Sequence, residues 1–410
     1  MSRHYDDLET MAPQEREARL LEWLSRLGLD AADASPFWKE RLTPVLSEGS
    51  LTREGLARLP VLRKSDLPGL QAASPPFAGV ATAPAAAFPR LFVSPGPICE
   101  PQATQDDAWN TARALFAAGF GPGQIVLNTF SYHLTPGGFV MDSGARALGC
   151  AVIPAGPGNT EQVVQAIGRY RPQAYTGTAD FLNILVEAAD AAGIDNPFER
   201  AAASGAALPP SLRAKLGARG IAVFELYATA ELGVIAYESE AHEGLVVNED
   251  VIVELLAPGT GDPVGEGEVG EVVVTRLDAA YPLIRFATGD LSRFIGGTSA
   301  CGRTGRRLAG WLGRADETAK VKGMFVHPAQ VRQILAAHQG AVTRARLVVT
   351  REDERDVLTL EAEASPASDL ETRLAESVRE VTRLGAAVRI LEPGRFGDDP
   401  RLIVDRRSYD

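Results

Sequence analysis

Short apolar runs alternate with longer amphipathic segments through the middle of the chain, from residue 105 onward. The apolar runs are typical of buried strands, and the longer segments carry apolar residues at helical spacing. Strands that alternate with helices of this kind predict βαβ units around a parallel sheet. The predicted strands are 124–128, 151–154, 174–176, 201–204 and 221–224, and the predicted helices include 160–170 and 180–191.

The pattern differs on both sides of this region. Near the start, apolar residues at helical spacing predict an amphipathic helix over 13–27. A stretch rich in Ala and Pro, 75–89, is typical of a linker or an irregular surface segment. From 234 to 294 the chain is strand-rich, with strands predicted at 251–256 and 268–275. After residue 316 a smaller set of helices and strands follows, so the fold class is α/β with two domains.

Composition excludes several classes of protein. The 410 residues carry a net charge of −12, which disfavours non-specific binding to nucleic acid or to an anionic membrane. No apolar run is long enough to cross a bilayer, and the polar start of the chain does not resemble a secretory signal. The cysteines, Cys99, Cys150 and Cys301, show neither disulfide-framework nor zinc-site spacing. We therefore expect a cytoplasmic protein.

Candidate chemistry is concentrated in the segment from Phe224 to Glu231, which follows an apolar run. Small residues there allow the backbone to approach a ligand closely. The hydroxyl of Thr229 and the carboxylate of Glu231 suit a hard divalent cation that carries phosphate. A strand that ends in Tyr and Glu is also a common edge of a hydrophobic core. Two later motifs favour the functional interpretation. They are Thr288-Gly289-Asp290-Leu291, which follows a predicted strand at 282–286, and Gly313-Arg314-Ala315-Asp316.

Several motifs in order resemble the phenylacetate-CoA ligase family of the adenylate-forming (acyl-CoA synthetase) superfamily, over nearly the whole chain. They are Ala203-Ser204-Gly205-Ala206-Ala207-Leu208-Pro209, Tyr227-Ala228-Thr229-Ala230-Glu231, Pro282-Leu283-Ile284-Arg285-Phe286, Thr288-Gly289-Asp290-Leu291, Cys301-Gly302-Arg303-Thr304, and Gly313-Arg314-Ala315-Asp316 with Lys322-Gly323 and His327-Pro328. The resemblance implies a large N-terminal domain (1–315), built of α/β layers with a small β-rich subdomain. It also implies a small, mobile α+β C-terminal domain (316–410).

The resemblance also implies roles for nucleotide-site residues. Glu231 would hold the Mg²⁺ that bridges ATP phosphates, and Tyr227 would lie along the adenine. The family carries Ser or Thr where this chain has Ala230, so Thr229 would have to supply the hydroxyl from one place earlier, where it should point elsewhere. Asp290 would accept hydrogen bonds from the ribose hydroxyls, and the Arg314 guanidinium would approach the nucleotide and match phosphate oxygens bidentately. For Asp290 the alternative is an ordinary aspartate in a turn, and for Arg314 it is a charged residue of the surface. The remaining nucleotide-binding positions implied by the family are Gly205, Ala206 and Ala207.

Other positions match the family's acyl and acceptor sites. The resemblance places Tyr132, His133, Gly137 and Gly138 in the wall of an acyl pocket, although His133 fits a hydrogen-bonded core histidine equally well. Asp316 matches the hinge of the C-terminal domain, where the alternative is an exposed loop aspartate. Lys322 and Gly323 match a loop that faces the acceptor channel.

The chain departs from the family at the phosphate loop and at the C-terminal lysine. The loop position reads Phe92-Val93-Ser94-Pro95-Gly96-Pro97-Ile98-Cys99-Glu100-Pro101, where prolines remove amide donors and a glutamate adds negative charge. No lysine follows Lys322, so Arg395 or Arg401 would have to replace the catalytic lysine, with a different shape of cation.

Three functional hypotheses follow. The first is a diverged ligase that activates an aryl or other small carboxylic acid through an acyl adenylate. It would use ATP and Mg²⁺, with CoA, a carrier protein or an amine as acceptor. The second is an acyltransferase that takes a preformed acyl adenylate or thioester without ATP. The third is a pseudo-ligase that binds a partner without catalysis. Family members commonly pair, so a homodimer is a further expectation.

Overall fold

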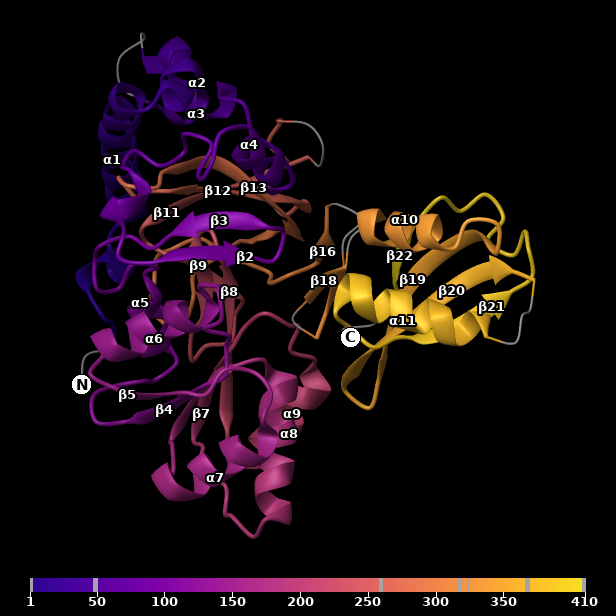
Figure 1. Ribbon diagram of the computed structural model, residues 1–410. Coiled ribbons are helices and arrows are strands. Elements are labelled where there is room, and N and C mark those ends of the chain that lie inside the picture. Colours follow the sequence, from indigo (N-terminus) through magenta and orange to yellow (C-terminus); the bar gives the residue numbers. More distant parts are fainter. Residues whose placement is uncertain are drawn as a thin grey trace. The chain divides into compact units, whose positions relative to one another are not determined.

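The computed structural model describes residues 3–46, 51–257, 261–315, 319–322, 324–326, 328–365 and 369–407 (Figure 1). The chain divides into two compact units. The first unit comprises Met1–Gly205 and Arg213–Ala315, and the second comprises Ala206–Leu212 and Asp316–Asp410. No described helix is both long and apolar enough to span a membrane.

A nine-stranded mixed sheet forms the centre of the first unit, in the order β14-β15-β10-β9-β8-β7-β6-β4-β5. The strands β5, β4, β6, β7 and β8 are parallel, as the βαβ pattern predicts, and β9 then turns back antiparallel to β8. The strands are β4 (Ile125–Asn128), β5 (Ala151–Pro154), β6 (Ala174–Gly177), β7 (Arg200–Ala203), β8 (Ala222–Thr229), β9 (Gly233–Glu238), β10 (Leu245–Val247), β14 (Phe294–Ile295) and β15 (Arg307–Leu308).

Helices connect the parallel strands and cover the sheet. Helices α5 and α6 pack together, with α6 against β4 and β5, and α7 and α8 form a second pair. Helices α7 and α8 match the predicted helices within one residue. The helices of this region are α5 (Thr111–Ala117), α6 (Gly137–Ala147), α7 (Thr160–Tyr170), α8 (Ala179–Ala191) and α9 (Pro210–Gly217).

A second sheet of the same unit carries the strand order β1-β13-β12-β11, with β16 paired to β13. The strand-rich pattern correctly predicts β11, but β13 continues past Phe286 through Asp290. The Thr-Gly-Asp-Leu motif is therefore part of a strand and not a turn that follows one, because β16 supplies a further partner for its backbone. The strands are β1 (Leu62–Arg63), β11 (Val251–Leu256), β12 (Gly270–Arg276), β13 (Leu283–Ser292) and β16 (Gly313–Arg314).

The N-terminal helices bury their apolar faces against this second sheet. Helix α1 begins with Pro13, whose fixed φ suits a first helical position, and buries Leu24 and Leu27 in a core shared with Phe286. Trp38 of α2 is buried in the same core and donates its indole N–H to the Val80 carbonyl, at 2.8 Å. The N-terminal elements are η1 (Asp7–Thr10), α1 (Pro13–Ala34), α2 (Pro36–Leu46), α3 (Arg53–Arg58), η2 (Lys64–Asp66), α4 (Leu67–Ala73) and η3 (Ala85–Ala87).

The second unit contains a four-stranded sheet in the order β21-β20-β19-β22, and helices α10 and α11 pack on it beside each other. Its apolar core includes Val331, Leu347, Leu360 and Leu374. The α+β composition agrees with the smaller set predicted after residue 316. Its elements are β17 (Ala319–Val321), β18 (Met324–Val326), α10 (Pro328–Ala337), β19 (Val342–Glu352), β20 (Arg355–Ala364), α11 (Leu370–Thr382), β21 (Ala387–Leu391) and β22 (Ile403–Asp405).

A buried network of charges connects the N-terminal segment to the first unit's sheets. The Glu9 carboxylate, fully buried, lies 2.7 Å from Nε of Arg303. Tyr237 donates its hydroxyl to the Glu249 carboxylate, at 3.0 Å, and Arg113 lies 3.4 Å from the same carboxylate. Burial raises the pKa of Glu249 to about 7, against the opposing charge of Arg113 and with the added repulsion of Glu9.

This raised pKa makes the stability of the protein depend on pH. The folded state holds the Glu249 proton more tightly than the unfolded state, so this contribution to stability is present below the ordinary carboxyl pKa and is lost as pH rises to about 7. The loss is at most about 3 kcal/mol. Glu249→Gln removes the titration. Relative to the wild type, the variant should therefore gain stability between about pH 5 and about pH 8 in chemical unfolding. If the free energies of unfolding of the variant and the wild type differ by the same amount at both pH values, the raised pKa of Glu249 is contradicted.

Candidate active site

Glu231 lies in the turn between β8 and β9, because β8 continues beyond the apolar run at 221–224 to Thr229. The two strands pair as a hairpin, with Thr229 opposite Gly233. Gly233 has φ +73 and lies so close to Trp109 that a Cβ would fall 2.6 Å from that side chain. The tight turn directs Glu231 inward, where its side chain is fully buried.

The cation nearest to Glu231 is the ammonium group of Lys64, with Nζ 2.6 Å from Oε1. Strand β1 runs parallel to β13, with Arg63 level with Ala287, so Lys64 follows at the level of Thr288. Burial alone would raise the pKa of the Glu231 carboxyl, but the Lys64 charge outweighs burial and holds that pKa below its ordinary value. The two residues form a buried salt bridge, although they lie 167 positions apart in the sequence.

A third buried charged group, Glu100, belongs to the short hairpin of β2 (Leu91–Ser94) and β3 (Ile98–Pro101). Its Oε1 accepts a hydrogen bond from the Ser94 hydroxyl, whereas its buried Oε2 has no hydrogen-bond partner among the described residues. Burial, and then the charge of Glu231, raises the pKa of Glu100 to about 8. The predicted site thus gathers two carboxyl groups and one ammonium in its interior.

Asp290 is the centre of a second cluster, which joins three strands. Its Oδ2 accepts the Tyr227 hydroxyl at 2.9 Å, and its Oδ1 accepts both Arg314 at 2.9 Å and the indole N–H of Trp311 at 3.0 Å. Pairing of β13 with β16 places Asp290 directly opposite Arg314. The Tyr227 hydroxyl oxygen also lies 3.1 Å from the hydroxyl oxygen of Thr288. Burial, and then the Asp290 charge, raises the pKa of Tyr227 well above its ordinary value.

Three of the predicted nucleotide residues therefore meet in one place. Tyr227, Asp290 and Arg314 come from separate motifs and contact one another through Asp290. The Asp290 oxygens bind three protein donors. Oδ2 accepts one of them, so it retains a lone pair for one further donor such as a hydroxyl. Thr229 lies at the end of β8, where its hydroxyl accepts the Leu232 N–H at 3.3 Å.

The predicted acyl-pocket residues lie in the segment between β4 and α6. The Tyr132 hydroxyl donates to Asp142 at 3.1 Å and accepts from the Asn128 amide at 2.7 Å. The Tyr132 ring lies against Gly138, where a Cβ would fall 2.7 Å from it, so this position requires glycine as long as the ring stays there. Gly137 begins α6, and His133 is exposed, which excludes the alternative of a buried core histidine.

The other predicted residues are spread more widely. Gly205 follows β7 with φ +80, a conformation that favours glycine, whereas Ala206 and Ala207 belong to the second unit. Arg401 binds Asp399 with Nε and NH2 at 2.9 and 2.8 Å, and its side chain is 58% exposed. Its catalytic role stays a prediction.

The remaining calls concern the hinge and the acceptor loop. Lys322 donates its backbone N–H to Asp356 at 3.2 Å. Asp316 and Gly323 lie outside the described residues. Their roles, like that of Lys322, stay predictions.

Sequence reasoning missed Lys64 and Trp311. Lysine is rare in this chain, and Lys64 follows a short apolar run, but nothing local connects it with a residue 167 positions away. Only the parallel pairing of β1 with β13 brings it to Glu231. Trp311 lies two positions before the Gly313-Arg314 motif, so its nearness to that motif was the available signal.

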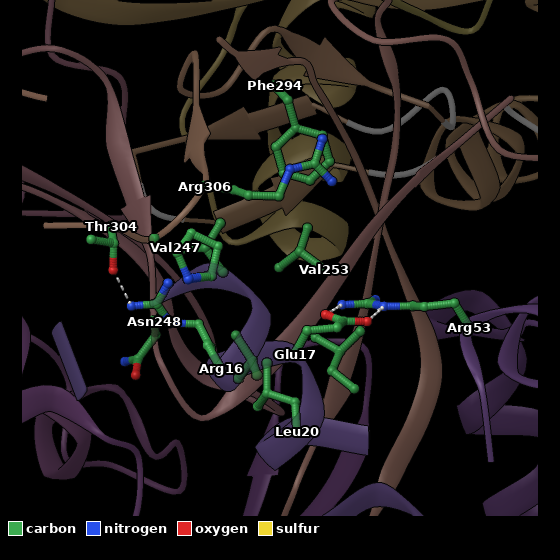
Figure 2. Close-up of a pocket in the computed structure, with 14 residues that line it drawn as sticks. Arg16, Glu17, Leu20, Arg53, Val247, Asn248, Val253, Phe294, Thr304 and Arg306 are labelled. Atoms are coloured by element: carbon green, nitrogen blue, oxygen red, sulfur yellow. Dashed lines mark hydrogen bonds and ion pairs between the residues drawn. The ribbon is translucent and has the colours of Figure 1, made fainter. Parts of the chain in front are cut away.

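A separate cavity of about 210 Å³ lies between α1 and the strands around β11 (Figure 2). Its polar groups pair within its own wall: Glu17 binds Arg53, and Arg16 donates to the Thr304 hydroxyl at 2.7 Å. Arg306 lies over the Phe294 ring, 3.3 Å from its centre. None of the residues predicted from the sequence as site residues lines this cavity, which is therefore distinct from the candidate site.

Comparison with protein families finds two matches along the chain. Residues 103–277 match the family described as AMP-binding enzyme, and residues 323–406 match the AMP-binding enzyme C-terminal domain. The first match contains Tyr132, Tyr227 and Glu231, and the second contains Arg401. Neither match contains the β2–β3 hairpin.

Individual relatives cover nearly the whole chain. A phenylacetate-coenzyme A ligase of Thermus thermophilus is 32% identical over 446 residues, which is 98% of this chain and 99% of the relative. A phenylacetate-coenzyme A ligase of Pseudomonas putida is 30% identical over 347 residues, 80% of this chain and 77% of the relative. A crystal structure of 2-hydroxyisobutyryl-CoA ligase in complex with 2-HIB-AMP and CoA has a TM-score of 0.88 at 26% identity. That likeness covers 100% of this chain and 93% of the neighbour.

Proposed function

Since the chain belongs to the phenylacetate-coenzyme A ligase family of AMP-binding enzymes, we propose that it is an acid–CoA ligase that works through an acyl adenylate. It passes the acyl group of a small carboxylic acid from the adenylate to the thiol of CoA. The named relatives are acid–CoA ligases, and the solved neighbour holds an acyl adenylate and CoA in one complex.

The cluster around Asp290 is the observation that carries this proposal. A carboxylate fixed by Tyr227, Trp311 and Arg314 is a rigid acceptor, and its Oδ2 has capacity for one ribose hydroxyl. The neighbouring Tyr227 ring supplies an aromatic surface for a base. The Arg314 guanidinium supplies a fork that matches the oxygens of a single phosphate. These groups together suit the nucleoside monophosphate part of an acyl adenylate.

The segment around Tyr132 suits the acyl group of an aryl or short-chain acid. Tyr132 is held from two sides by Asp142 and Asn128, and Gly138 leaves room for its ring. Phe139 packs edge-on against Tyr132, with ring centres 5.0 Å apart. A wall of fixed aromatic rings favours a flat or compact apolar acyl group.

Other parts of the proposal concern the acceptor, the partners and the location. CoA is the proposed acceptor, and Lys322 and Gly323 are proposed to face its channel. A carrier protein or an amine as acceptor, rotation of the second unit at Asp316, a homodimer and a cytoplasmic location stay predictions.

The proposed function is tested with synthetic acyl adenylates. Phenylacetyl adenylate and 2-hydroxyisobutyryl adenylate are each mixed with CoA and the purified protein, and acyl-CoA is measured by mass spectrometry. We expect thioester formation well above the rate without protein, and a marked loss with Asp290→Asn. A folded protein that accelerates thioester formation from none of a panel of aryl and short aliphatic adenylates would contradict the proposal.

A further inference from the structure

The β2–β3 hairpin carries the segment that the resemblance matches to the family's phosphate loop, and it forms a small sheet of its own (Figure 1). A phosphate-binding loop works through backbone N–H groups that point together at the anion. Here Ser94 pairs with Ile98, so the turn between the strands contains only Pro95, Gly96 and Pro97. Because proline has no N–H, Gly96 alone offers a backbone donor in this turn.

The donors beside the turn already have partners within the protein. The Val93 N–H donates to the Leu134 carbonyl at 2.7 Å, and the Cys99 N–H donates to the Gln71 side chain at 2.7 Å. The Ser94 hydroxyl, only 3% exposed, donates to Glu100. A triphosphate would therefore meet one amide instead of a ring of amides and hydroxyls.

The side chains behind the hairpin also offer little to a triphosphate. Glu100 is buried in the hairpin, and its Oε2 has no hydrogen-bond partner among the described residues, so this position supplies a carboxyl group and no cation for a polyphosphate. The carboxylate predicted to hold Mg²⁺, Glu231, has Lys64 at 2.6 Å from one of its oxygens. Magnesium requires near-octahedral oxygen ligands, and a nearby ammonium opposes a second cation. The residues present therefore do not fit magnesium triphosphate.

The monophosphate half of the nucleotide site is arranged differently. Tyr227, Asp290 and Arg314 lie on β8, β13 and β16 and contact one another through Asp290. The chain thus retains the groups that suit AMP and lacks the groups that suit the pyrophosphate portion of ATP. Activation of the acid by ATP needs the pyrophosphate portion of the site, whereas transfer of the acyl group from the adenylate to a thiol needs only the AMP portion.

We propose that this protein receives its acyl adenylate ready-made from a separate, ATP-dependent acid-adenylating enzyme and carries out only the transfer to the thiol. This inference rests on the proposed function. In the transfer, the thiol sulfur forms a bond to the acyl carbon while the bond from that carbon to the phosphate oxygen breaks. AMP leaves with the electron pair, and the thiol proton goes to solvent. Ligation of the acid to CoA is then shared between two enzymes, and this chain catalyses the second half, from the acyl adenylate to the thioester, without consuming ATP.

The test compares two reactions of the full chain under one set of conditions. The first contains phenylacetyl adenylate, or another adenylate that is accepted, with CoA. The second contains the corresponding acid with ATP, MgCl₂ and CoA, and acid-dependent ATP–pyrophosphate exchange is measured in parallel. We expect acyl-CoA in the first reaction, and a rate at least about 100-fold lower in the second, because each lost phosphate stabiliser typically costs about that factor.

Each outcome separates the inference from the proposed function. Acyl-CoA from the adenylate alone supports both. Acid-dependent exchange, with acyl-CoA formed from ATP at a comparable rate, overturns the inference and leaves the proposed function standing. Failure of both reactions overturns the proposed function, and the inference with it.

A variant of the hairpin turn provides a matched control. Pro95 and Pro97 are exposed and contact neither Asp290 nor Tyr227 in any hydrogen bond. Pro95→Ala with Pro97→Ala should leave the adenylate-dependent rate within about twofold of the wild type, because the turn is outside the monophosphate site. A large loss of that rate in a folded variant would show that the hairpin holds the nucleotide, and would overturn the inference.

Discussion

Replacing Lys64 with methionine should lower the free energy of unfolding by about 3 kcal/mol. The Glu231 carboxylate is fully buried, and the Lys64 ammonium, 21% exposed, lies 2.6 Å from it. Methionine matches the length of lysine but leaves the carboxylate without its counter-charge, and an uncompensated buried charge is strongly destabilising. Equilibrium unfolding in urea, with wild type and variant at the same pH, measures the difference.

The double variant Lys64→Met with Glu231→Gln is the control. Because the amide removes the buried charge, the double variant should recover much of the stability that the single variant loses. A single variant as stable as the wild type would contradict the assignment of this pair as a buried salt bridge. A double variant less stable than the single variant would contradict the charge as the cause.

Asp290→Asn should weaken the binding of an acyl-adenylate analogue by about 100-fold. The substitution keeps the shape of the side chain but removes the charge that Arg314 pairs with, and it replaces one acceptor oxygen with a donor. Tyr227 or a ribose hydroxyl then loses its partner, and Arg314 loses its ion pair with residue 290. Titration calorimetry with a non-hydrolysable acyl sulfamoyl adenosine measures the affinity.

Trp311→Phe is the matched control for this prediction. It removes one donor to Asp290 but leaves the carboxylate and its other two partners in place. Its loss of affinity should be about tenfold, which corresponds to the lower end of the worth of a hydrogen bond to a charged group. Equal affinities of wild type and Asp290→Asn, both folded, would contradict the role of Asp290 in nucleotide binding.

The sequence predicts the local elements of this fold well where periodicity is strong. The strands at 151–154 and 251–256 and the helix at 160–170 have the predicted bounds. The limits of β8 and β13 were wrong because strand length depends on a partner strand. Strand β9 extends β8 through Tyr227, and β16 extends pairing along β13 to Asp290. Such pairing is a long-range property that no local window contains.

The same distinction applies to the site. The resemblance assigned Tyr227, Asp290 and Arg314 to one nucleotide site, and in the structure these residues contact one another through Asp290. Their role in binding a nucleotide stays a prediction. The contact of Lys64 with Glu231 could not be predicted, since it depends on the register of β1 against β13. The prolines at 95 and 97 indicated a changed phosphate loop, and the structure adds that the neighbouring donors are all in use.

The most direct test of the central claim is the binding of an acyl adenylate at the Asp290 cluster. The wild-type chain is titrated in the calorimeter with phenylacetyl sulfamoyl adenosine, and separately with ATP in the presence of MgCl₂. The account predicts binding of the adenylate analogue, one molecule per chain, and an affinity for magnesium ATP at least about 100-fold lower. A folded protein that binds magnesium ATP as tightly as the analogue, or that binds neither, would contradict it.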